Sequence, residues 1–461
     1  MKQRTKKNLP RFLITVSLLV LIICGWYSWV AFPIISGYGA KILASGIFVQ
    51  HRSAADVISQ DLSDFPVSLA GYSVNRNDSS VTATVWGFAS QKAIFRHGAG
   101  CTLVNEISEQ EMRKQYFKMP PPPGIDPDTL NWPAGNKIRD SIPASVNRVA
   151  LAKAVDGAMN DTFENKPAFT RSVIVVYDGN IIAEKYAQGF NSKSLLPGWS
   201  VSKSITGALV AILVRANKLN PDAPAPVNGW ENSGKTNILL KYLLQQSSGL
   251  DFRENYTGPS EATNMLFKRG NMGAYIAQLP LKYAPGTVFN YSSGNSNLIS
   301  LIIRNSVGEK DYHAFPYQAL FYKCGMYSAL LEPDASGTFV GSSYCFATAR
   351  DFARFGLLYY NNGVMNGEQI LPSGWVKKTT EPATADKQQH YGLQFWLNGF
   401  SKNDSTKRWY PDVPADMYFA DGFGGQDIYV IPSRKLVVVR LGLHIIRENR
   451  FLKEVIASIR E

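Results

Sequence analysis

A serine and a lysine three residues apart, Ser200 and Lys203, are the first candidates for chemistry in this chain. Pro197 and Gly198 precede them, and the apolar run of residues 205–214 that follows predicts a buried helix. Residues at this spacing share a helix face, so the hydroxyl and the amine would lie within reach of each other. Burial disfavours the ammonium form, and a neutral amine can take the hydroxyl proton. The pair predicts an activated nucleophile; the alternative is a helix-capping serine beside a solvated lysine.

A tyrosine and a serine in the stretch Tyr291-Ser292-Ser293 could complete such a site. The phenol of Tyr291 could relay a proton to a leaving group, and Ser293 could orient Tyr291 or Lys203. Taken alone, the same stretch also fits an ordinary surface loop.

A glycine-rich stretch, residues 421–426, directly precedes a predicted strand. Gly422 and Gly424 would let the backbone approach a substrate closely and leave N–H groups pointing into a cleft. The N–H of Phe423 is therefore a candidate oxyanion donor, together with the N–H of Ser200 at the start of its helix. The alternative for this stretch is a plain glycine-rich turn.

The elements that must position these residues follow from the hydrophobic pattern. Strands are predicted at both ends of the region, over residues 172–177, 181–186, 391–397, 427–431 and 436–441, and helices lie between and around them. The Asp178-Gly179-Asn180 triplet predicts a hairpin between the first two strands. This order favours a discontinuous antiparallel sheet packed by helices, an α+β arrangement of the α/β class with a mainly helical subdomain.

The N-terminus carries an uncharged apolar segment, Phe12 to Phe32, behind five basic residues and no acidic one. As a helix it would measure about 31 Å, enough to span a bilayer core, and aromatic residues gather at its far end. A cleaved signal peptide is the rival, but no good small-x-small cleavage site follows. We therefore expect a single-pass inner-membrane anchor with a cytoplasmic N-terminus and the catalytic domain on the periplasmic or extracytoplasmic side.

Charge and cysteine content exclude other classes. The net charge of +12 is spread out rather than clustered, so a nucleic-acid partner is not expected. No Cys/His spacing resembles a zinc site, and we predict neither a metal nor a cofactor. Cys324 and Cys345 could form a disulfide in an oxidising compartment. The sequence indicates no oligomeric state.

The expected domain organisation follows from these segments. It consists of a cytoplasmic basic tail (1–11), a transmembrane anchor (12–32), a small N-terminal extension (33–110), a Pro-rich linker that wraps the surface (111–144) and a catalytic domain (145–461).

The order Ser-x-x-Lys, Tyr-x-Ser, glycine-bearing strand resembles that of the serine β-lactamase and penicillin-binding-protein superfamily over residues 145–461. Three further stretches are similar to family segments: Gln246-Ser247-Ser248-Gly249-Leu250, Pro285-Gly286-Thr287 and residues 349–356. Within the superfamily the chain looks most like the class C-related branch of esterases and 6-aminohexanoate-dimer hydrolases. The resemblance implies the β-lactamase/transpeptidase-like fold.

The resemblance also implies roles. Ser200 would be acylated, Lys203 and Tyr291 would act as general base and acid, and the N–H groups of Ser200 and Phe423 would hold the oxyanion. Tyr256 would line the acyl pocket, unless it is simply an exposed loop residue. The implied function is a membrane-anchored serine hydrolase that cleaves a small amide or ester. The alternatives are a penicillin-binding carboxypeptidase or β-lactamase, and a non-catalytic binding domain on the same fold.

One departure from the family pattern concerns substrate choice. Where the superfamily carries a cationic residue, then Thr or Ser, then Gly, this chain has Ala420-Asp421-Gly422, so the cation that anchors a substrate carboxylate is missing. Arg440 on the neighbouring strand could replace that cation. If the turn pairs Pro432 with Lys435, however, Arg440 falls opposite Asp427 and would form a cross-strand ion pair instead.

Overall fold

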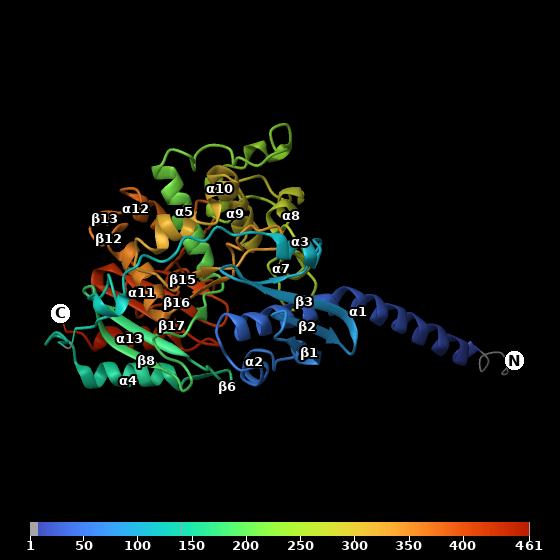
Figure 1. Ribbon diagram of the computed structural model, residues 1–461, viewed down its shortest axis with the longest axis horizontal. Coiled ribbons are helices and arrows are strands. Elements are labelled where there is room, and N and C mark those ends of the chain that lie inside the picture. The colour runs from blue at the N-terminus through green and yellow to red at the C-terminus, as the bar shows by residue number, and fades with distance from the viewer. Residues whose placement is uncertain (1–7, 140, 461) are drawn as a thin grey trace.

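A six-stranded antiparallel sheet forms the centre of the catalytic region in the computed structural model, which describes residues 8–139 and 141–460 (Figure 1). The strand order is β14-β15-β16-β17-β7-β8. The bounds are β7 Ser172–Tyr177, β8 Asn180–Tyr186, β14 Trp396–Leu397, β15 Tyr418–Gly422, β16 Gln426–Ile431 and β17 Leu436–Leu441. The pairing of β17 with β7 joins the two ends of the region, which confirms the predicted discontinuous sheet.

Both faces of this sheet are covered, because successive residues of its central strands point into two separate cores. Val437 and Val439 face one core, which α11 (Ala349–Tyr360) shares. Val438 faces the other, where α4 (Arg148–Met159) and α13 (Glu448–Ala457) pack. This explains why β17 reads as a continuous apolar run rather than an alternating one.

The predicted strand over residues 391–397 is wrong in its extent, since only Trp396–Leu397 is a strand. Gln394 has a left-handed backbone with φ of +59°, and its side-chain amide donates to the carbonyls of Leu243 and Leu244. A side chain placed on Gly392 would lie 1.8 Å from the Thr379 carbonyl oxygen. The segment therefore bends to bind helix α6 instead of extending.

The helical part of the catalytic region lies between the two groups of strands. Its long helices, α5 (Val201–Arg215) and α9 (Ser293–Val307), pack against each other in the larger core. The shorter helices are α6 Leu240–Leu244, α7 Glu261–Lys268, α8 Met272–Gln278, α10 Glu309–Tyr312 and α12 Trp375–Thr380, and a small sheet joins β10 Leu330–Leu331, β11 Cys345–Ala347 and β9 Leu196–Pro197.

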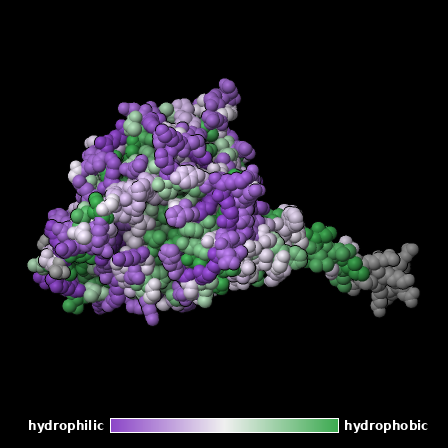
Figure 2. Space-filling model, in the orientation of Figure 1, coloured by the Kyte–Doolittle hydropathy of each residue, from purple (hydrophilic) through white to green (hydrophobic). Residues whose placement is uncertain are grey.

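A single helix, α1 (Asn8–Phe48), continues well beyond the predicted anchor. Its first part projects from the body as a hydrophobic rod (Figures 1 and 2), whereas from Ala31 onward it is largely buried. The stretch Phe12–Phe48 is long and apolar enough to cross a membrane. The first seven residues of the predicted basic tail lie outside the described residues.

The rest of the N-terminal extension packs around the buried half of α1. It contains α2 (Ala54–Asp61) and a four-stranded antiparallel sheet of β1 Ala70–Asn75, β2 Ser80–Val85, β3 Phe88–Arg96 and β4 Gly100–Leu103, followed by α3 (Glu109–Lys114). Strands β2 and β3 lie against α1, and α1 also reaches α7 of the catalytic region. The extension and the catalytic region thus share one hydrophobic core.

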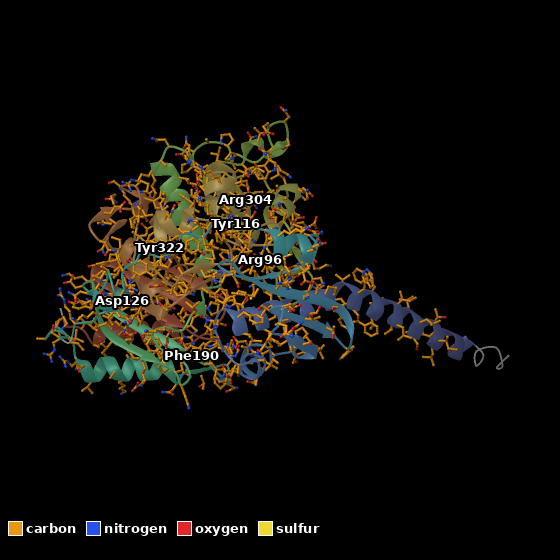
Figure 3. All side chains as sticks on the ribbon, viewed as in Figure 1. Arg96, Tyr116, Asp126, Phe190, Arg304 and Tyr322 are labelled. Atoms are coloured by element: carbon orange, nitrogen blue, oxygen red, sulfur yellow. The ribbon has the colours of Figure 1, made fainter. Side chains whose placement is uncertain are left out.

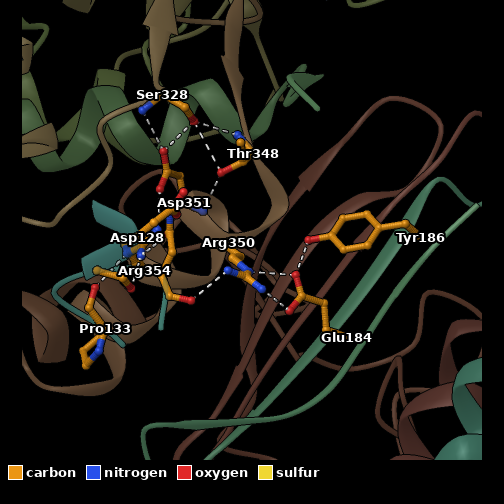
Figure 4. Close-up of polar contacts among 11 residues, drawn as sticks. Asp128, Pro133, Glu184, Tyr186, Ser328, Thr348, Arg350, Asp351 and Arg354 are labelled. Carbon is orange, nitrogen blue, oxygen red and sulfur yellow. Dashed lines mark hydrogen bonds and ion pairs between the residues drawn. The ribbon is translucent and has the colours of Figure 1, made fainter. Parts of the chain in front are cut away.

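The Pro-rich segment runs along the surface of the catalytic region, as expected for a long connector. The hydroxyl of Tyr322 donates to the Pro120 carbonyl at 2.8 Å (Figure 3). Further on, Arg354 donates to the Pro133 carbonyl at 2.8 Å while it pairs with Asp351 (Figure 4). Arg350, on the same helix α11, makes a two-bond ion pair with Glu184 of β8. Helix α11 therefore ties the segment to the sheet.

The four cysteines are separate thiols. Cys324 and Cys345 are both buried and do not form the disulfide that the sequence allowed.

Candidate active site

Ser200 occupies the N-cap position of α5, at the end of a tightly held turn. The preceding residue, Trp199, has φ of +46°, an unfavourable conformation for a bulky side chain. Gly198 donates its N–H to the Cys345 carbonyl at 2.8 Å, and a side chain there would meet the Phe352 ring at 2.9 Å. The strained turn thus presents the partly exposed Ser200 at the open end of a helix.

Lys203 lies one turn further along α5, as the spacing predicted. Its Nζ is 2.8 Å from the Ser200 Oγ and donates to the Ser342 carbonyl at 3.2 Å. The side chain is 1% exposed. Burial lowers the pKa of Lys203 from 10.5 to about 8, against the opposing effect of the negative charges of Glu254 and Asp421. A substantial fraction of the amine is therefore neutral near pH 8 and able to accept a proton.

Tyr291 is the third side chain of this arrangement and lies beside Lys203. The Lys203 Nζ lies 4.8 Å from the centre of the Tyr291 ring, which stacks on Trp396 at a centroid distance of 5.1 Å. Burial raises the pKa of Tyr291 well above its usual value, and the interaction with the Ser200 hydroxyl opposes that shift. The phenol is therefore protonated at neutral pH and available as a proton donor or relay.

The segment Gln246-Ser247-Ser248-Gly249-Leu250 supports the loop that carries Tyr291. The Gln246 side-chain oxygen accepts from the Ser292 N–H at 3.1 Å and from the Asn295 amide at 3.0 Å. The Ser248 hydroxyl donates to the Asn295 side chain at 2.8 Å. This segment therefore fixes the start of α9, and with it the position of Tyr291, without reaching Ser200 itself.

The glycine-rich stretch lies directly against the start of α5. A side chain on Gly422 would come within 2.2 Å of the Gly198 carbonyl oxygen and 3.1 Å of the Ser200 nitrogen, so only glycine fits. The Phe423 carbonyl accepts from the Gln426 amide at 3.0 Å, which fixes that peptide. Across residues 8–139 and 141–460, the N–H groups of Ser200 and Phe423 have no acceptor, which leaves both available for an oxyanion.

Arg440 holds the turn that follows Phe423. Its guanidinium donates to the carbonyls of Gly424 at 2.9 Å and Gly425 at 2.8 Å, and to the Thr170 hydroxyl. The predicted register with Asp427 is confirmed, but Arg440 is fully buried. It therefore does not replace the missing substrate-binding cation, and its hydrogen bonds go to the backbone rather than into a simple cross-strand pair.

Ala420 stands where the superfamily pattern places that cation, and the next residue is Asp421. Its strand partner is Asp427, and burial together with the nearby Glu448 raises the pKa of both aspartates. Any negative charge that Asp421 carries raises the pKa of Lys203. This edge of the site is acidic rather than basic.

Glu254 is a site residue that the sequence reasoning did not single out. It accepts from the Ser293 N–H at 2.8 Å, from the Ser293 hydroxyl at 2.6 Å and from the Tyr256 hydroxyl at 2.7 Å. Tyr256 also lies 3.2 Å from the Ser293 hydroxyl, so the predicted residues Ser293 and Tyr256 meet through this carboxylate. Its position beside Tyr256 in the chain was the only available signal.

A cavity adjoins the site on the far side of Trp199. Its walls include Trp199, Tyr344 and Phe423 from the catalytic region and Tyr38, Lys41 and Ile42 from α1. The Trp199 ring stacks on Tyr38 at 6.4 Å and meets Phe423 edge-on at 5.7 Å. Helix α1 is therefore a wall of the space next to the candidate nucleophile, which the sequence did not indicate.

No group of metal-binding side chains gathers anywhere in the part of the chain that the structure describes. The chemistry available at this site is that of the serine, the lysine, the tyrosine and the backbone N–H groups.

Comparisons with known proteins identify the family of this chain. The Beta-lactamase family profile matches residues 159–442. A 6-aminohexanoate-dimer hydrolase of Paenarthrobacter ureafaciens is 22% identical over 287 residues, which are 59% of this chain and 72% of that protein.

Two solved structures have a similar fold. A Bacillus anthracis protein proposed to be a 6-aminohexanoate-dimer hydrolase has a TM-score of 0.54 at 21% identity, over 70% of this chain and 85% of that one. A family VIII carboxylesterase also has a TM-score of 0.54, at 13% identity, over 70% of this chain and all of its own length. At these identities the likeness concerns the fold.

Proposed function

The chain belongs to the beta-lactamase family of serine hydrolases, and we propose that it is a membrane-anchored enzyme that cleaves a small amide or ester through an acyl-enzyme on Ser200. The observation that carries this proposal is the 2.8 Å contact between the Ser200 hydroxyl and a buried lysine whose pKa lies near 8. Ser200 is partly exposed, so this pair is accessible to a substrate, unlike a lysine and a serine enclosed in the core.

In the proposed acylation step the neutral Lys203 amine takes the proton of Ser200 as its oxygen attacks the substrate carbonyl carbon. The negative charge that develops on the carbonyl oxygen is held by the N–H groups of Ser200 and Phe423. When the intermediate collapses, the bond to the leaving amine or alcohol breaks, and Tyr291 passes the proton from Lys203 to that group. Water then enters, gives up a proton to the same pair, and releases the acid from Ser200.

The acidic edge of the site bears on the substrate. The uncharged Ala420 occupies the place of the carboxylate-binding cation, Asp421 follows it, and Arg440 is buried behind the glycine turn. A substrate carboxylate at this position would find no cation to bind, and the nearest charged group in the strand is the carboxyl of Asp421. This favours an uncharged amide or ester over a β-lactam or a D-alanyl peptide. The relative named as a 6-aminohexanoate-dimer hydrolase and the structural neighbour named as a carboxylesterase support the same two bond types.

Active-site labelling of the full chain in detergent tests the proposal. A fluorophosphonate should label the wild-type protein and not Ser200→Ala. The matched control is Ser202→Ala, because Ser202 lies in the same helix but accepts the Cys345 N–H inside the core. Label retained in Ser200→Ala, or lost equally in both variants, would contradict the assignment.

A substrate screen then separates the candidate functions. We expect turnover of p-nitrophenyl esters or linear amides that exceeds turnover of nitrocefin. Faster nitrocefin hydrolysis would assign the protein to the β-lactamase alternative, and labelling without turnover of any substrate would favour a binding domain.

The anchoring part of the proposal is supported by the projecting half of α1. Its apolar residues from Phe12 to Trp29 are mostly exposed, and the basic residues precede them. We propose that this half spans the inner membrane with the N-terminus in the cytoplasm. Protease added to intact spheroplasts should digest the catalytic region. Full protection, with a periplasmic control protein digested in the same sample, would contradict that orientation.

A further inference from the structure

The tip of the β2–β3 hairpin presents two exposed aromatic side chains that the proposed reaction does not use. Trp86 is 68% exposed and Phe88 is 69% exposed. The turn is the two-residue kind, with φ of +52° at Trp86 and +84° at Gly87. A tryptophan in this conformation is unfavourable, yet the turn holds its ring outside the body.

This tip is attached to α1 at the point where the helix leaves the body. The Trp86 ring meets Phe32 edge-on at a centroid distance of 5.4 Å, and the Ser36 hydroxyl donates to the Ala89 carbonyl at 2.5 Å. Figure 1 shows the sheet of β1–β4 beside α1 at this end of the body. The tip is therefore held in a fixed position relative to the projecting helix.

The height of the tip along α1 matches that of the aromatic residues on the helix. Phe32 lies about 4.5 Å further along the axis than Trp29, which is less than one helical turn. Trp26, Tyr27 and Trp29 are all at least half exposed there. Aromatic side chains with a polar edge gather where a bilayer meets water. If α1 spans the membrane, the hairpin tip lies at the same interface.

The sequence of the hairpin fits a lipid surface. The chain carries no charged residue between Asp78 and Lys92, so nothing at the tip resists transfer into the headgroup region. An apolar patch continuous with a membrane-spanning helix has the bilayer as its nearest neighbour. We propose that Trp86 and Phe88 insert into the outer interface of the bilayer as a second membrane contact, an inference that rests on the proposed anchoring by α1.

A second contact would set the orientation of the active site. A single helix leaves the body free to rotate and tilt, whereas two contacts define a plane. The loop that carries Glu254 and Tyr256 also reaches this level, because a side chain on Gly258 would lie 3.3 Å from the Tyr27 hydroxyl. The loop that carries Glu254 and Tyr256 therefore lies close to the level of the membrane surface, where an amphiphilic substrate would concentrate.

Tryptophan fluorescence of the full chain in phosphatidylcholine vesicles tests the inference. The probe is lipid brominated in the upper part of the acyl chain, which quenches only tryptophans at that depth. Trp86→Phe should remove part of the bromolipid-quenchable emission and leave the iodide-quenchable emission unchanged. The matched control is Trp409→Phe, because Trp409 is 41% exposed and belongs to the aromatic cluster around His390 and Trp396. Trp409→Phe should remove part of the iodide-quenchable emission and leave the bromolipid-quenchable emission unchanged.

Three further variants separate the possible failures. Phe88→Trp in the Trp86→Phe background should restore bromolipid quenching by moving the indole two positions along the tip. Trp26→Phe and Trp29→Phe should each lower bromolipid quenching if α1 is in the bilayer. Quenching that depends on Trp26 and Trp29 but not on the tip overturns the second contact alone. Loss of iodide quenching in Trp86→Phe also overturns the second contact. If bromolipid quenching depends on none of these residues, the anchor itself is overturned.

Discussion

Two buried lysines of this protein have nearly identical surroundings and different consequences. Lys41 of α1 and Lys203 of α5 are 2% and 1% exposed. Each Nζ lies 2.8 Å from a serine hydroxyl, Ser45 or Ser200, and each lies over a tyrosine ring. The difference is one carboxylate, because Lys41 forms an ion pair with the fully buried Glu332, whereas no acid among the described residues pairs with Lys203.

That difference separates a structural lysine from a reactive one. The ion pair of Lys41 with Glu332 joins α1 to the catalytic region, and Glu332 also accepts the Cys101 N–H. Among the residues that the structure describes, Lys203 has only a hydroxyl and a carbonyl as hydrogen-bond partners, so burial outweighs the more distant charges and lowers its pKa to about 8. A buried lysine is therefore a candidate base when no counter-ion lies beside it, as at Lys203.

The largest expected effect comes from the two serines. Ser200→Ala should lower kcat/KM by about 10⁴-fold or more, because it removes the attacking oxygen. Ser45→Ala removes the equivalent partner of Lys41 and should leave kcat/KM within a few fold. Steady-state kinetics on one ester, with circular dichroism to show folding, would check both. A comparable loss in Ser45→Ala would mean that the two sites do not differ as proposed.

The next effect concerns the base. Lys203→Arg should lower the acylation rate by about 10²- to 10⁴-fold, because arginine stays protonated and accepts no proton. Tyr291→Phe should cause a loss of similar order, since it keeps the ring and removes the proton relay. Pre-steady-state acylation of Ser200 measures both. If Lys203→Arg kept most of its acylation rate, Lys203 would be only a structural partner.

Stability should change in opposite directions at the two lysines. Lys41→Met leaves Glu332 buried without a counter-ion and should lower the free energy of unfolding by about 3–5 kcal/mol. Lys203→Met should raise it at pH 7 by up to about 3 kcal/mol, because the shift from 10.5 to about 8 disfavours the folded state. Chemical denaturation in detergent would measure each change.

A double variant is the control for that pair of changes. Lys41→Met with Glu332→Leu should recover most of the stability lost in Lys41→Met, since no uncompensated charge is left. A double variant as unstable as the single one would show that packing rather than charge explains the loss.

The pH dependence follows from the same pKa. The neutral amine is the active form, so acylation should fall as pH decreases below about 8, along one titration of the coupled Lys203 and Tyr291. The free energy of unfolding should also change with pH because of Lys203, and it should rise with pH as the acylation rate does. The unfolded chain holds the extra proton between pH 8 and 10.5, so stability rises with pH across that window. Rates that were flat from pH 6 to 9 would contradict the assignment.

The smallest expected effect concerns Glu254. Its negative charge raises the pKa of Lys203, so Glu254→Gln should move the acid limb of the rate profile toward lower pH. The glutamine retains an oxygen that can accept from Ser293. A shift toward higher pH, or none, would show that Glu254 acts only by holding Tyr256 and Ser293 in place.

The sequence alone determined the local features of this protein. A spacing of three residues placed Ser200 and Lys203 on one helix face, and apolar patterning predicted β7, β8, β16 and β17. A turn that pairs Pro432 with Lys435 predicted the register of Arg440 and Asp427. The order of three short motifs was sufficient to predict the family and the fold. Such features depend on neighbours in the chain, where helix and strand periodicities apply directly.

Only the tertiary structure decided which distant groups meet. The pairing of Lys41 with Glu332 joins residues 291 positions apart, and Glu254 reaches Ser293 across 39 positions. Arg440 is buried and holds the glycine turn, because the carbonyls of that turn accept hydrogen bonds from its guanidinium. Residues 391–395 bend because the Gln394 side chain donates to a carbonyl of α6. No periodicity encodes these contacts, since they arise from how whole elements pack. The same packing makes the part of α1 that lies beyond the predicted anchor a wall of the cavity beside Trp199.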